Sequence, residues 1–330
     1  MDSPLLSIII PVYNAEQYLP LCLDSIFGAS VDPELYEVIT IDDCSSDHSY
    51  EILQQYAQRH PNLRCSRHEV NLQLGETRND GIRQARGEYV WFVDSDDKVK
   101  TENLPKLFRI LESRQLDLIA FNYTRFCDTG EYRMDRYHLT ASPVLSGMDL
   151  YTHSHSFPAP WNKIYRRSML TDNKLFFVPK RLPEDQGWLT ECYLHARKAQ
   201  SFDIELYCWH VTPGSVSNDL RRVGQYINGF TALIEEQTAM MTTYSAPLFW
   251  THNMFYLFTG YNARIWQAVS EGLISDMEYE QRLRWEKERV DAVLKLLPFS
   301  FCREYLCMCL LRVCPGLFIK TRNLVRRFRP

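Results

Sequence analysis

The chain has 330 residues, of which 45% are hydrophobic, and a formal net charge of −4 at pH 7. Its length and apolar content suffice for a self-supporting core, so we expect a globular protein. A general binder of nucleic acid needs a basic surface that neutralises phosphates, and the acidic balance therefore argues against nucleic acid as a partner.

Apolar β-branched runs alternate with helical patterns in the first hundred residues. Strands are predicted within "LLSIIIPVYN" (5–14), "YEVITIDD" (36–43), "LRCSRH" (63–68) and "GEYVWFVDSDD" (87–97). Helices are predicted within "AEQYLPLCLDSIFG" (15–28), "HSYEILQQYAQRH" (48–60) and "GETRNDGIRQARG" (75–87). Such alternation implies right-handed crossovers, and the sequence therefore predicts an α/β fold with a mainly parallel sheet flanked by helices.

Polar residues follow the ends of three of these strands. Tyr13 and Asn14 follow the first strand, Asp42 and Asp43 end the second, and the fourth runs into residues 94–97. In open parallel sheets, ligands bind beyond the carboxyl ends of the strands. We therefore expect these three loops to gather along one edge of the sheet and to carry the chemistry.

Asp94, Ser95 and Asp96 form an Asp-x-Asp turn after a buried strand. Alternate carboxylates there can share one divalent cation, and oxygen ligands suit Mg²⁺ or Mn²⁺. A solvated turn is the alternative, or a helix N-cap, for which Asp97 is placed ahead of the next helix. The second acidic pair at 42–43 favours a ligand site, because capping does not explain two such turns.

The patterns after residue 100 are less regular. We predict a helix at 103–116, a strand at 117–126, a further strand or an excursion at 131–140, and a helix at 186–199. Helical patterns dominate from about residue 221, where the aromatic stretch at 247–266 is expected to pack a core. The simplest division is a domain at 1–220 with a mostly helical extension at 221–330.

Several motifs occur in order and at suitable separations: "SIIIPVYNAEQYLPLCLDSI", "VITIDDCSSD", "NLQLGETRNDGIRQARGEYVWFVDSDD", "PWNKIYRRSML" and "LPEDQGW". Together they resemble the bacterial family 2 glycosyltransferases, over residues 5–100 most closely and to about residue 217 in part. The resemblance implies a GT-A fold at 1–220 and an enzyme that takes a sugar from a nucleotide-sugar, usually a UDP-sugar. It also implies inversion at the anomeric carbon and Mn²⁺ or Mg²⁺ as cofactor.

The family's pattern implies roles for the residues of the first two loops. Pro11, Tyr13 and Asn14 would line the nucleobase pocket, and Asp43 would accept a hydrogen bond from the uracil ring. Arg78, on the helix after the "NLQLG" loop, would approach the pyrophosphate or the base.

The resemblance also implies roles around the Asp-x-Asp. Asp94 and Ser95 would lie by the ribose, with Asp94 also near the metal, and Asp96 would ligate the cation directly. His210, in "LYCWHVTPGSVS", would reach the metal or the diphosphate. Where the family often has a glycine after the acidic pair, this chain has Cys44.

The acceptor side of the family's site corresponds to two further stretches. Asp185 in "RLPEDQGW" would be the catalytic base, with Glu184 as a competitor. On spacing alone, these acids would instead cap the following helix. Trp161 and Lys163 would lie beside the acceptor and the donor sugar; the alternative is a buried Trp in a turn with a surface Lys.

The C-terminal segment 300–330 carries seven basic residues and one acidic residue. Such an asymmetry suggests an anionic partner, and the inner leaflet of a membrane is one. The alternative is a packed terminal helix with a solvated basic end. The apolar stretch 305–319 is too short for a span and is interrupted by Arg312 and Pro315. Without paired cysteine spacings or a secretory signal, we expect reduced thiols and a cytoplasmic enzyme, peripheral on the inner face of the plasma membrane.

The resemblance predicts an inverting transferase that moves a hexose, glucose or galactose by family frequency, to a hydroxyl of a bacterial surface glycan. The expected acceptor is lipopolysaccharide core or a lipid-linked O-antigen or capsule intermediate. Two other classes stay open at this point. A phosphatase of the haloacid dehalogenase type also places an Asp-x-Asp after a strand, and a non-catalytic carbohydrate-binding protein is the third possibility.

Overall fold

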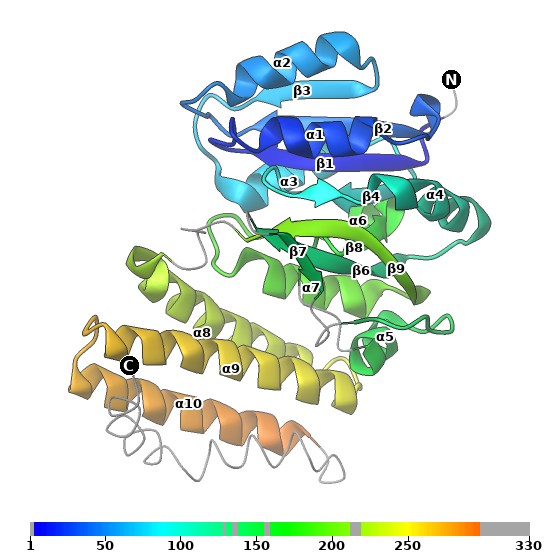
Figure 1. Ribbon diagram of the computed structural model, residues 1–330. Helices are drawn as coiled ribbons and strands as arrows, with labels where there is room; N and C mark the ends of the chain where they lie inside the picture. Colours follow the sequence, from blue (N-terminus) through cyan, green and yellow to red (C-terminus); the bar gives the residue numbers. More distant parts are fainter. Residues whose placement is uncertain (1–2, 128–129, 134–137, 155–158, 212–218, 298–330) are drawn as a thin grey trace. The chain divides into compact units, whose positions relative to one another are not determined.

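A computed structural model describes residues 3–127, 130–133, 138–154, 159–211 and 219–297 of the chain (Figure 1). The chain divides into two compact units, Met1–Asn218 and Asp219–Pro330. The basic segment at 300–330, to which we assigned an anionic partner, lies outside the described residues.

Over its described residues, the first unit is built on one nine-stranded sheet. Its strands are β1 (Leu6–Val12), β2 (Tyr36–Asp42), β3 (Leu63–Arg67), β4 (Tyr89–Phe92), β5 (Lys98–Val99), β6 (Leu118–Cys127), β7 (Gly130–Arg133), β8 (Lys163–Arg166) and β9 (Ala199–His210). Their order is β3-β2-β1-β4-β8-β6-β9-β5, with β7 beside β6. All pairs from β3 to β4 are parallel, whereas β8 runs antiparallel to both of its neighbours. The predicted α/β class is confirmed, and the sheet becomes mixed beyond β4.

Helices cover both faces of this sheet. They are α1 (Leu19–Phe27), α2 (Ser49–Arg59), α3 (Gln73–Gln84), α4 (Leu104–Ser113), α5 (Gly147–Ser154), α6 (Arg167–Asp172) and α7 (Glu184–His195). The first three match the predicted helices, although α3 begins two residues earlier than expected. The sequence analysis missed α5, α6, β5, β8 and β9, and it predicted the start of α7 two residues too late.

Strand β1 shows why its sequence is a continuous apolar run. Ile8 and Ile10 belong to the hydrophobic cluster that includes the buried side of α1. Ile9 points the other way, and a Cβ on Gly81 of α3 would lie only 2.2 Å from its Cγ2. A strand buried on both faces has no polar side, so the alternation typical of a half-exposed strand is absent.

An aromatic cluster fixes α7 on the face of the sheet that also carries α3. Trp188 of α7 stacks on Phe177, with ring centroids 4.3 Å apart, and meets Phe92 of β4 and Tyr165 of β8 edge-on. Edge-to-face and stacked pairs contribute beyond their buried area. The first turn of α7 is therefore held at a fixed place near the end of β4.

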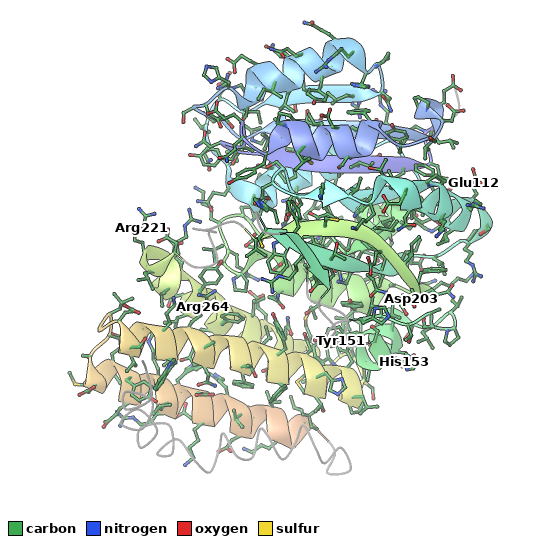
Figure 2. The ribbon with its side chains drawn as sticks, viewed as in Figure 1. Glu112, Tyr151, His153, Asp203, Arg221 and Arg264 are labelled. Atoms are coloured by element: carbon green, nitrogen blue, oxygen red, sulfur yellow. The ribbon has the colours of Figure 1, made fainter. Side chains whose placement is uncertain are left out.

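The second unit consists, over its described residues, of α8 (Val223–Met240), α9 (Pro247–Ser270) and α10 (Asp276–Leu296) after a short 3-10 turn. The aromatic stretch expected to pack a core supplies the buried face of α9. Gly260 of α9 lies against the Phe230 ring of α8. Arg264 of α9, which Figure 2 labels, lies over the ring of Tyr226 of α8. These contacts bring α8 and α9 close together.

Two whole-chain expectations concern thiols and membranes. The cysteines within the described residues, namely Cys22, Cys44, Cys65, Cys127, Cys192 and Cys208, are free thiols. None of the helices in the described ranges has both the length and the apolar character that crossing a bilayer requires.

Candidate functional site

The loop after β1 is tied to the loop after β2 through Asn14. Its side-chain oxygen accepts from the backbone N–H of Ser46 at 2.8 Å, and its own backbone N–H donates to the Ser45 hydroxyl. Asn14 has a left-handed backbone (φ 49°), which Asn tolerates better than most residues. Tyr13 beside it is 54% exposed, whereas Pro11 is part of buried β1. The structure brings these residues together at the carboxyl ends of β1 and β2, and their contact with a nucleobase stays a prediction.

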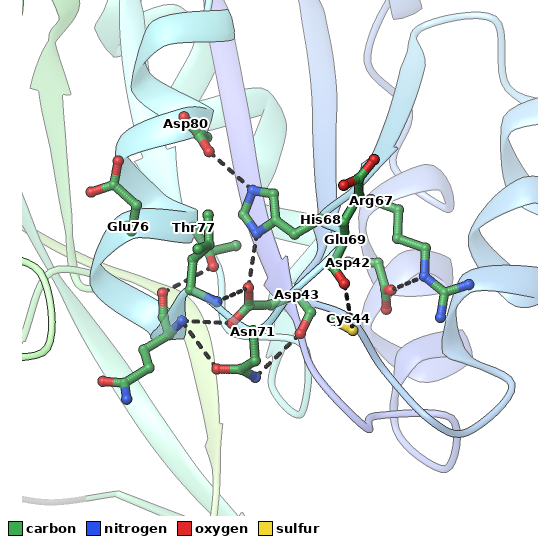
Figure 3. Close-up of polar contacts among 12 residues, drawn as sticks. Asp42, Asp43, Cys44, Arg67, His68, Glu69, Asn71, Glu76, Thr77 and Asp80 are labelled. Atoms are coloured by element: carbon green, nitrogen blue, oxygen red, sulfur yellow. Dashed lines mark hydrogen bonds and ion pairs between the residues drawn. The ribbon is translucent and has the colours of Figure 1, made fainter.

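Asp43 joins the β2 loop to the start of α3 (Figure 3). Its Oδ1 accepts from the backbone N–H of Leu72 at 2.8 Å, and its Oδ2 accepts from that of Gln73 at 2.8 Å. His68 Nδ1 also lies 2.8 Å from Oδ1. The carboxylate is only 3% exposed, and it satisfies N–H groups at the helix N-terminus, where negative charge is favoured. Contact with uracil stays a prediction.

Asp42 and Cys44 flank this carboxylate. Asp42 is fully buried and pairs with Arg67, whose Nε lies 3.1 Å from Oδ2. Cys44 has a φ of 62°, in the left-handed region that favours glycine. The departure from the family's glycine at this position therefore leaves a strained residue directly after Asp43.

The first residue of the Asp-x-Asp forms an ion pair with Arg78. Arg78 Nη2 lies 2.8 Å from Asp94 Oδ1, and the arginine is only 2% exposed. Its guanidinium also lies over the rings of Phe92 and Phe177. Burial opposes the charge, but the carboxylates, with that of Asp94 first among them, raise the pKa of Arg78. Approach of Arg78 to a pyrophosphate stays a prediction; in the structure its partner is Asp94.

Asp97 has a role that the sequence analysis did not identify. Its Oδ2 accepts from the Tyr207 hydroxyl at 2.6 Å, and its Oδ1 accepts from the backbone N–H of His210 at 2.6 Å. Burial, together with the nearby carboxylates of Asp96 and Asp94, raises the pKa of Asp97 well above its usual range. The alternative of Asp97 as a helix cap is wrong, because both of its carboxylate oxygens accept hydrogen bonds from β9.

Ser95 and Asp96, which are half-buried, lie in the loop that Asp97 anchors. His210 ends β9 beside this loop, and its ring stacks on Phe126 with centroids 4.6 Å apart and contacts the Tyr18 ring at 5.1 Å. The structure thus brings His210 to the Asp-x-Asp loop. Its contact with a metal or a diphosphate stays a prediction.

Glu184 and Asp185 lie in the first turn of α7, after Pro183 as the N-cap residue. They do not cap the helix, although negative charge is favoured at this end. Burial first, and then the Glu184 carboxylate, raise the pKa of Asp185 to about 7, while Arg78 opposes the shift. Asp185 is therefore a carboxylate that can take up a proton near neutral pH.

Trp161 and Lys163 are both buried. Trp161 stacks on Tyr207 with centroids 4.5 Å apart, and the Lys163 ammonium donates to the carbonyl of Ala159 and to the side chain of Asn162. Burial lowers the pKa of Lys163 to about 7, against the opposing effect of Asp185. The alternative of a surface Lys is wrong, and an acceptor-side role for these residues stays a prediction.

The carboxylates of Asp94 and Asp96 could provide part of a cation site. Within the ranges that the structure describes, no group of three or more His, Cys, Asp or Glu side chains is arranged to hold a metal ion. Mg²⁺, however, ordinarily binds through one or two carboxylates together with substrate phosphates and waters. Two alternate carboxylates on one loop fit such a shared site, because the protein need not supply every ligand.

Sequence reasoning missed two residues that hold the site together. Tyr207 donates to Asp97 and accepts the backbone N–H of Asp94 at 3.0 Å, and His68 contacts Asp43. No local signal marks Tyr207, which is more than a hundred residues from its partners. His68 ends a predicted strand at the same sheet edge as Asp43, and that placement was the one signal available.

A family model described as glycosyl transferase family 2 matches residues 7–173. The chain is 30% identical over 220 residues to an uncharacterized glycosyltransferase, EpsJ, of Bacillus subtilis. The aligned region covers 65% of this chain and 63% of EpsJ. It is 32% identical over 206 residues to TarS of Staphylococcus aureus, a poly(ribitol-phosphate) beta-N-acetylglucosaminyltransferase, covering 61% of this chain and 34% of TarS. The chain thus spans less than two thirds of the length of these curated relatives.

Solved structures show the same fold. The crystal structure of residues 1–349 of S. aureus TarS with UDP-GlcNAc superposes with a TM-score of 0.71 at 22% identity, over 93% of this chain and 87% of that one. A mannosyltransferase of Pyrobaculum calidifontis with GDP-Man and Mn²⁺ gives a TM-score of 0.53 at 16% identity, over 97% and 88% of the two chains. These likenesses confirm the predicted fold class.

The Tyr207 contacts generate a first prediction. In Tyr207→Phe, the Asp97 carboxylate and the Asp94 N–H each lose a partner, so the Asp-x-Asp loop loses its fixed position and about 1–3 kcal/mol of stability. We expect UDP affinity in the presence of Mn²⁺ to fall at least fivefold by calorimetry. Tyr89→Phe is the matched control, since it removes a hydroxyl that bonds the Arg114 carbonyl away from the loop. Equal affinities in the two variants would contradict the anchoring role.

Proposed function

The chain belongs to glycosyl transferase family 2, and we propose that it transfers a sugar, with inversion, from a UDP-sugar to a hydroxyl of a bacterial surface glycan. Membership rests on the family match over residues 7–173. The proposed reaction rests on the groups gathered at one edge of the sheet, with Asp185 as catalytic base and the 94–96 loop as the donor's anchor.

The observation that carries the proposal is the electrostatic setting of Asp185. A general base works best when its pKa lies near the working pH, and the pKa of Asp185 is about 7. Arg78 pairs with Asp94 and also lowers the pKa of Asp185, so the proposed base and the Asp-x-Asp loop have one guanidinium as a common neighbour. Transfer between two bound molecules requires the base and the donor anchor to lie close together, and their shared neighbour Arg78 supports that proximity.

Inversion needs the acceptor hydroxyl to attack from the face opposite the departing UDP. A neutral hydroxyl is a weak nucleophile, so the proton has to leave as the new bond forms. In this scheme Asp185 Oδ accepts that proton, and the first turn of α7, held by the aromatic cluster around Trp188, keeps the carboxylate in place.

A divalent cation fits the Asp94–Asp96 loop, and Mn²⁺ or Mg²⁺ is the proposed cofactor. A cation there would stabilise the negative charge that develops on the leaving diphosphate. The presence of Mn²⁺ in the structure of the mannosyltransferase supports the assignment.

The donor is proposed to be a UDP-sugar because the structure of TarS, which has the same fold, contains UDP-GlcNAc. Glucose or galactose remains our prediction for the transferred hexose, and UDP-GlcNAc belongs in the same screen. The acceptor is proposed to be a surface glycan, since TarS is named as acting on poly(ribitol-phosphate). Lipopolysaccharide core, O-antigen and capsule intermediates remain predictions alongside that polymer.

The basic segment at 300–330 is proposed to hold the enzyme on the inner face of the plasma membrane, close to a lipid-linked acceptor. Seven basic residues there support this, at roughly 1 kcal/mol for each one near an anionic surface. Co-sedimentation of the full chain with anionic vesicles but not with neutral ones is expected, and equal binding to both would contradict the proposal. Family membership leaves the phosphatase and the non-catalytic alternatives without support.

The roles of Glu184 and Asp185, in the first turn of α7, can be distinguished by pH profiles of UDP release from the donor. Asp185→Asn is expected to bind UDP as the wild type does and to lose at least a hundredfold in kcat, because no base remains. Glu184→Gln removes a carboxylate that raises the pKa of Asp185. Activity, which requires Asp185 deprotonated, should therefore rise at a pH about one unit lower than in the wild type. Loss of activity in Glu184→Gln, with Asp185→Asn active, would reverse the assignment.

The cation site is tested by calorimetric titration with UDP, with and without Mn²⁺. The wild type is expected to bind UDP at least tenfold more tightly with Mn²⁺, and Asp96→Asn to lose that difference, because one carboxylate ligand is gone. Glu102→Gln, on the short turn after β5, serves as a control for removal of one acidic charge. A metal effect that survives in Asp96→Asn would contradict the assignment of Asp96.

A further inference from the structure

His68 follows β3 and connects it to β2 and to α3 (Figure 3). Its backbone N–H donates to the Asp42 carbonyl at 2.9 Å. Its ring lies between two carboxylates: Nδ1 is 2.8 Å from Asp43 Oδ1, and Nε2 is 3.0 Å from Asp80 Oδ2. A carboxylate oxygen is an acceptor, so each ring nitrogen is placed to donate. The side chain is only 13% exposed, and the mechanism proposed above does not use it.

The hydrogen bonds of Asp43 show what His68 contributes. Each carboxylate oxygen can accept two hydrogen bonds. Oδ1 has two donors, the Leu72 N–H and His68 Nδ1, whereas Oδ2 has the Gln73 N–H. Among these contacts, the acceptor position left for a further N–H is on Oδ2. His68 therefore fills Oδ1 and leaves one direction in which Asp43 can accept a ligand.

Asp80 holds the ring of His68 from its other side. Asp80 lies on α3, where its Oδ1 is paired with Arg83, and its Oδ2 faces His68 Nε2. The imidazole is thus held between Asp43, in the loop after β2, and Asp80, on helix α3. Such an arrangement limits rotation of the ring, and through the ring it limits rotation of the Asp43 carboxylate.

We infer that His68 is a positioning residue that sets the base specificity of the donor site through Asp43. The inference rests on the proposed function, in which Asp43 meets the uracil ring. Uracil presents an N–H at N3, and a single open acceptor can bind it. Cytosine presents an acceptor nitrogen at N3, which an oxygen held in that place repels. Without the His68 donor, Oδ1 gains an open position and the carboxylate can turn, so that the amino group of cytosine can also be accepted.

Two isosteric variants separate the two contacts of the ring. The amide nitrogen of Asn lies where Nδ1 lies, so His68→Asn keeps a donor to Asp43 and loses the contact with Asp80. The longer side chain of Gln places its amide nitrogen near the position of Nε2, so His68→Gln keeps Asp80 and loses Asp43. The two variants are otherwise alike in polarity, and each removes one of the two ring contacts.

The experiment is calorimetric titration of the full chain and both variants with UDP and with CDP, in saturating Mn²⁺. We expect the wild type to prefer UDP, and His68→Asn to keep the ratio of the two affinities within about twofold. His68→Gln should lower that ratio about tenfold, the effect of losing one hydrogen bond to a charged group. Titration with inorganic pyrophosphate and Mn²⁺ should be unchanged in both variants, because pyrophosphate has no base.

Each outcome of these titrations supports or overturns the inference. If the ratio of UDP affinity to CDP affinity is the same in both variants, whether at the wild-type value or below it, the inference is overturned. The contact with Asp43 would then not set specificity. If His68→Gln does not fold, the result for His68→Asn decides by itself: a tenfold fall of its affinity ratio would overturn the inference. A wild type that binds UDP no better than CDP would overturn the donor proposal and the inference with it. A wild type that prefers UDP while both variants behave alike would remove only the role of His68.

Discussion

The acidic groups of the site depend on the positive charge of Arg78, whose guanidinium is buried. It is 2% exposed, pairs with Asp94 and lies near Glu184 and Asp185. Carboxylates gathered in a partly dry site repel one another and resist desolvation, so they need a compensating cation. Arg78 supplies one that cannot lose its proton, and the site can therefore exist before any donor or metal has bound.

Asp43 and Asp97 differ from Asp185 in their physical role. Asp43 and Asp97 accept backbone N–H groups, so they bind the β2 loop to α3 and the Asp-x-Asp loop to β9. Burial first, and then the charge of Glu184, instead raise the pKa of Asp185 to about 7, so this carboxylate can exchange a proton near neutral pH. One group of acids thus builds the scaffold, whereas the raised pKa of Asp185 is the reason why we propose that residue as the catalytic base.

The sequence predicted what is local and periodic. Strands buried on both faces appear as apolar runs, and the polar residues at their carboxyl ends lie along one edge of the sheet, as predicted. Strands β8 and β9 were missed because β8 has four residues and β9 shows mixed burial. The burial of Lys163 and the anchoring of Asp97 by Tyr207 were not predictable, because they depend on partners brought together only by the folded sheet.

The central claim, that Arg78 lowers the proton affinity of the proposed base, is tested most directly by the pH profile of UDP release in Arg78→Gln. Arg78 lowers the pKa of Asp185, so its removal should raise that pKa. Because the base must be deprotonated, the rise of activity should move to a pH about one unit higher than in the wild type. A profile that stays in place, or moves to lower pH, would contradict the account.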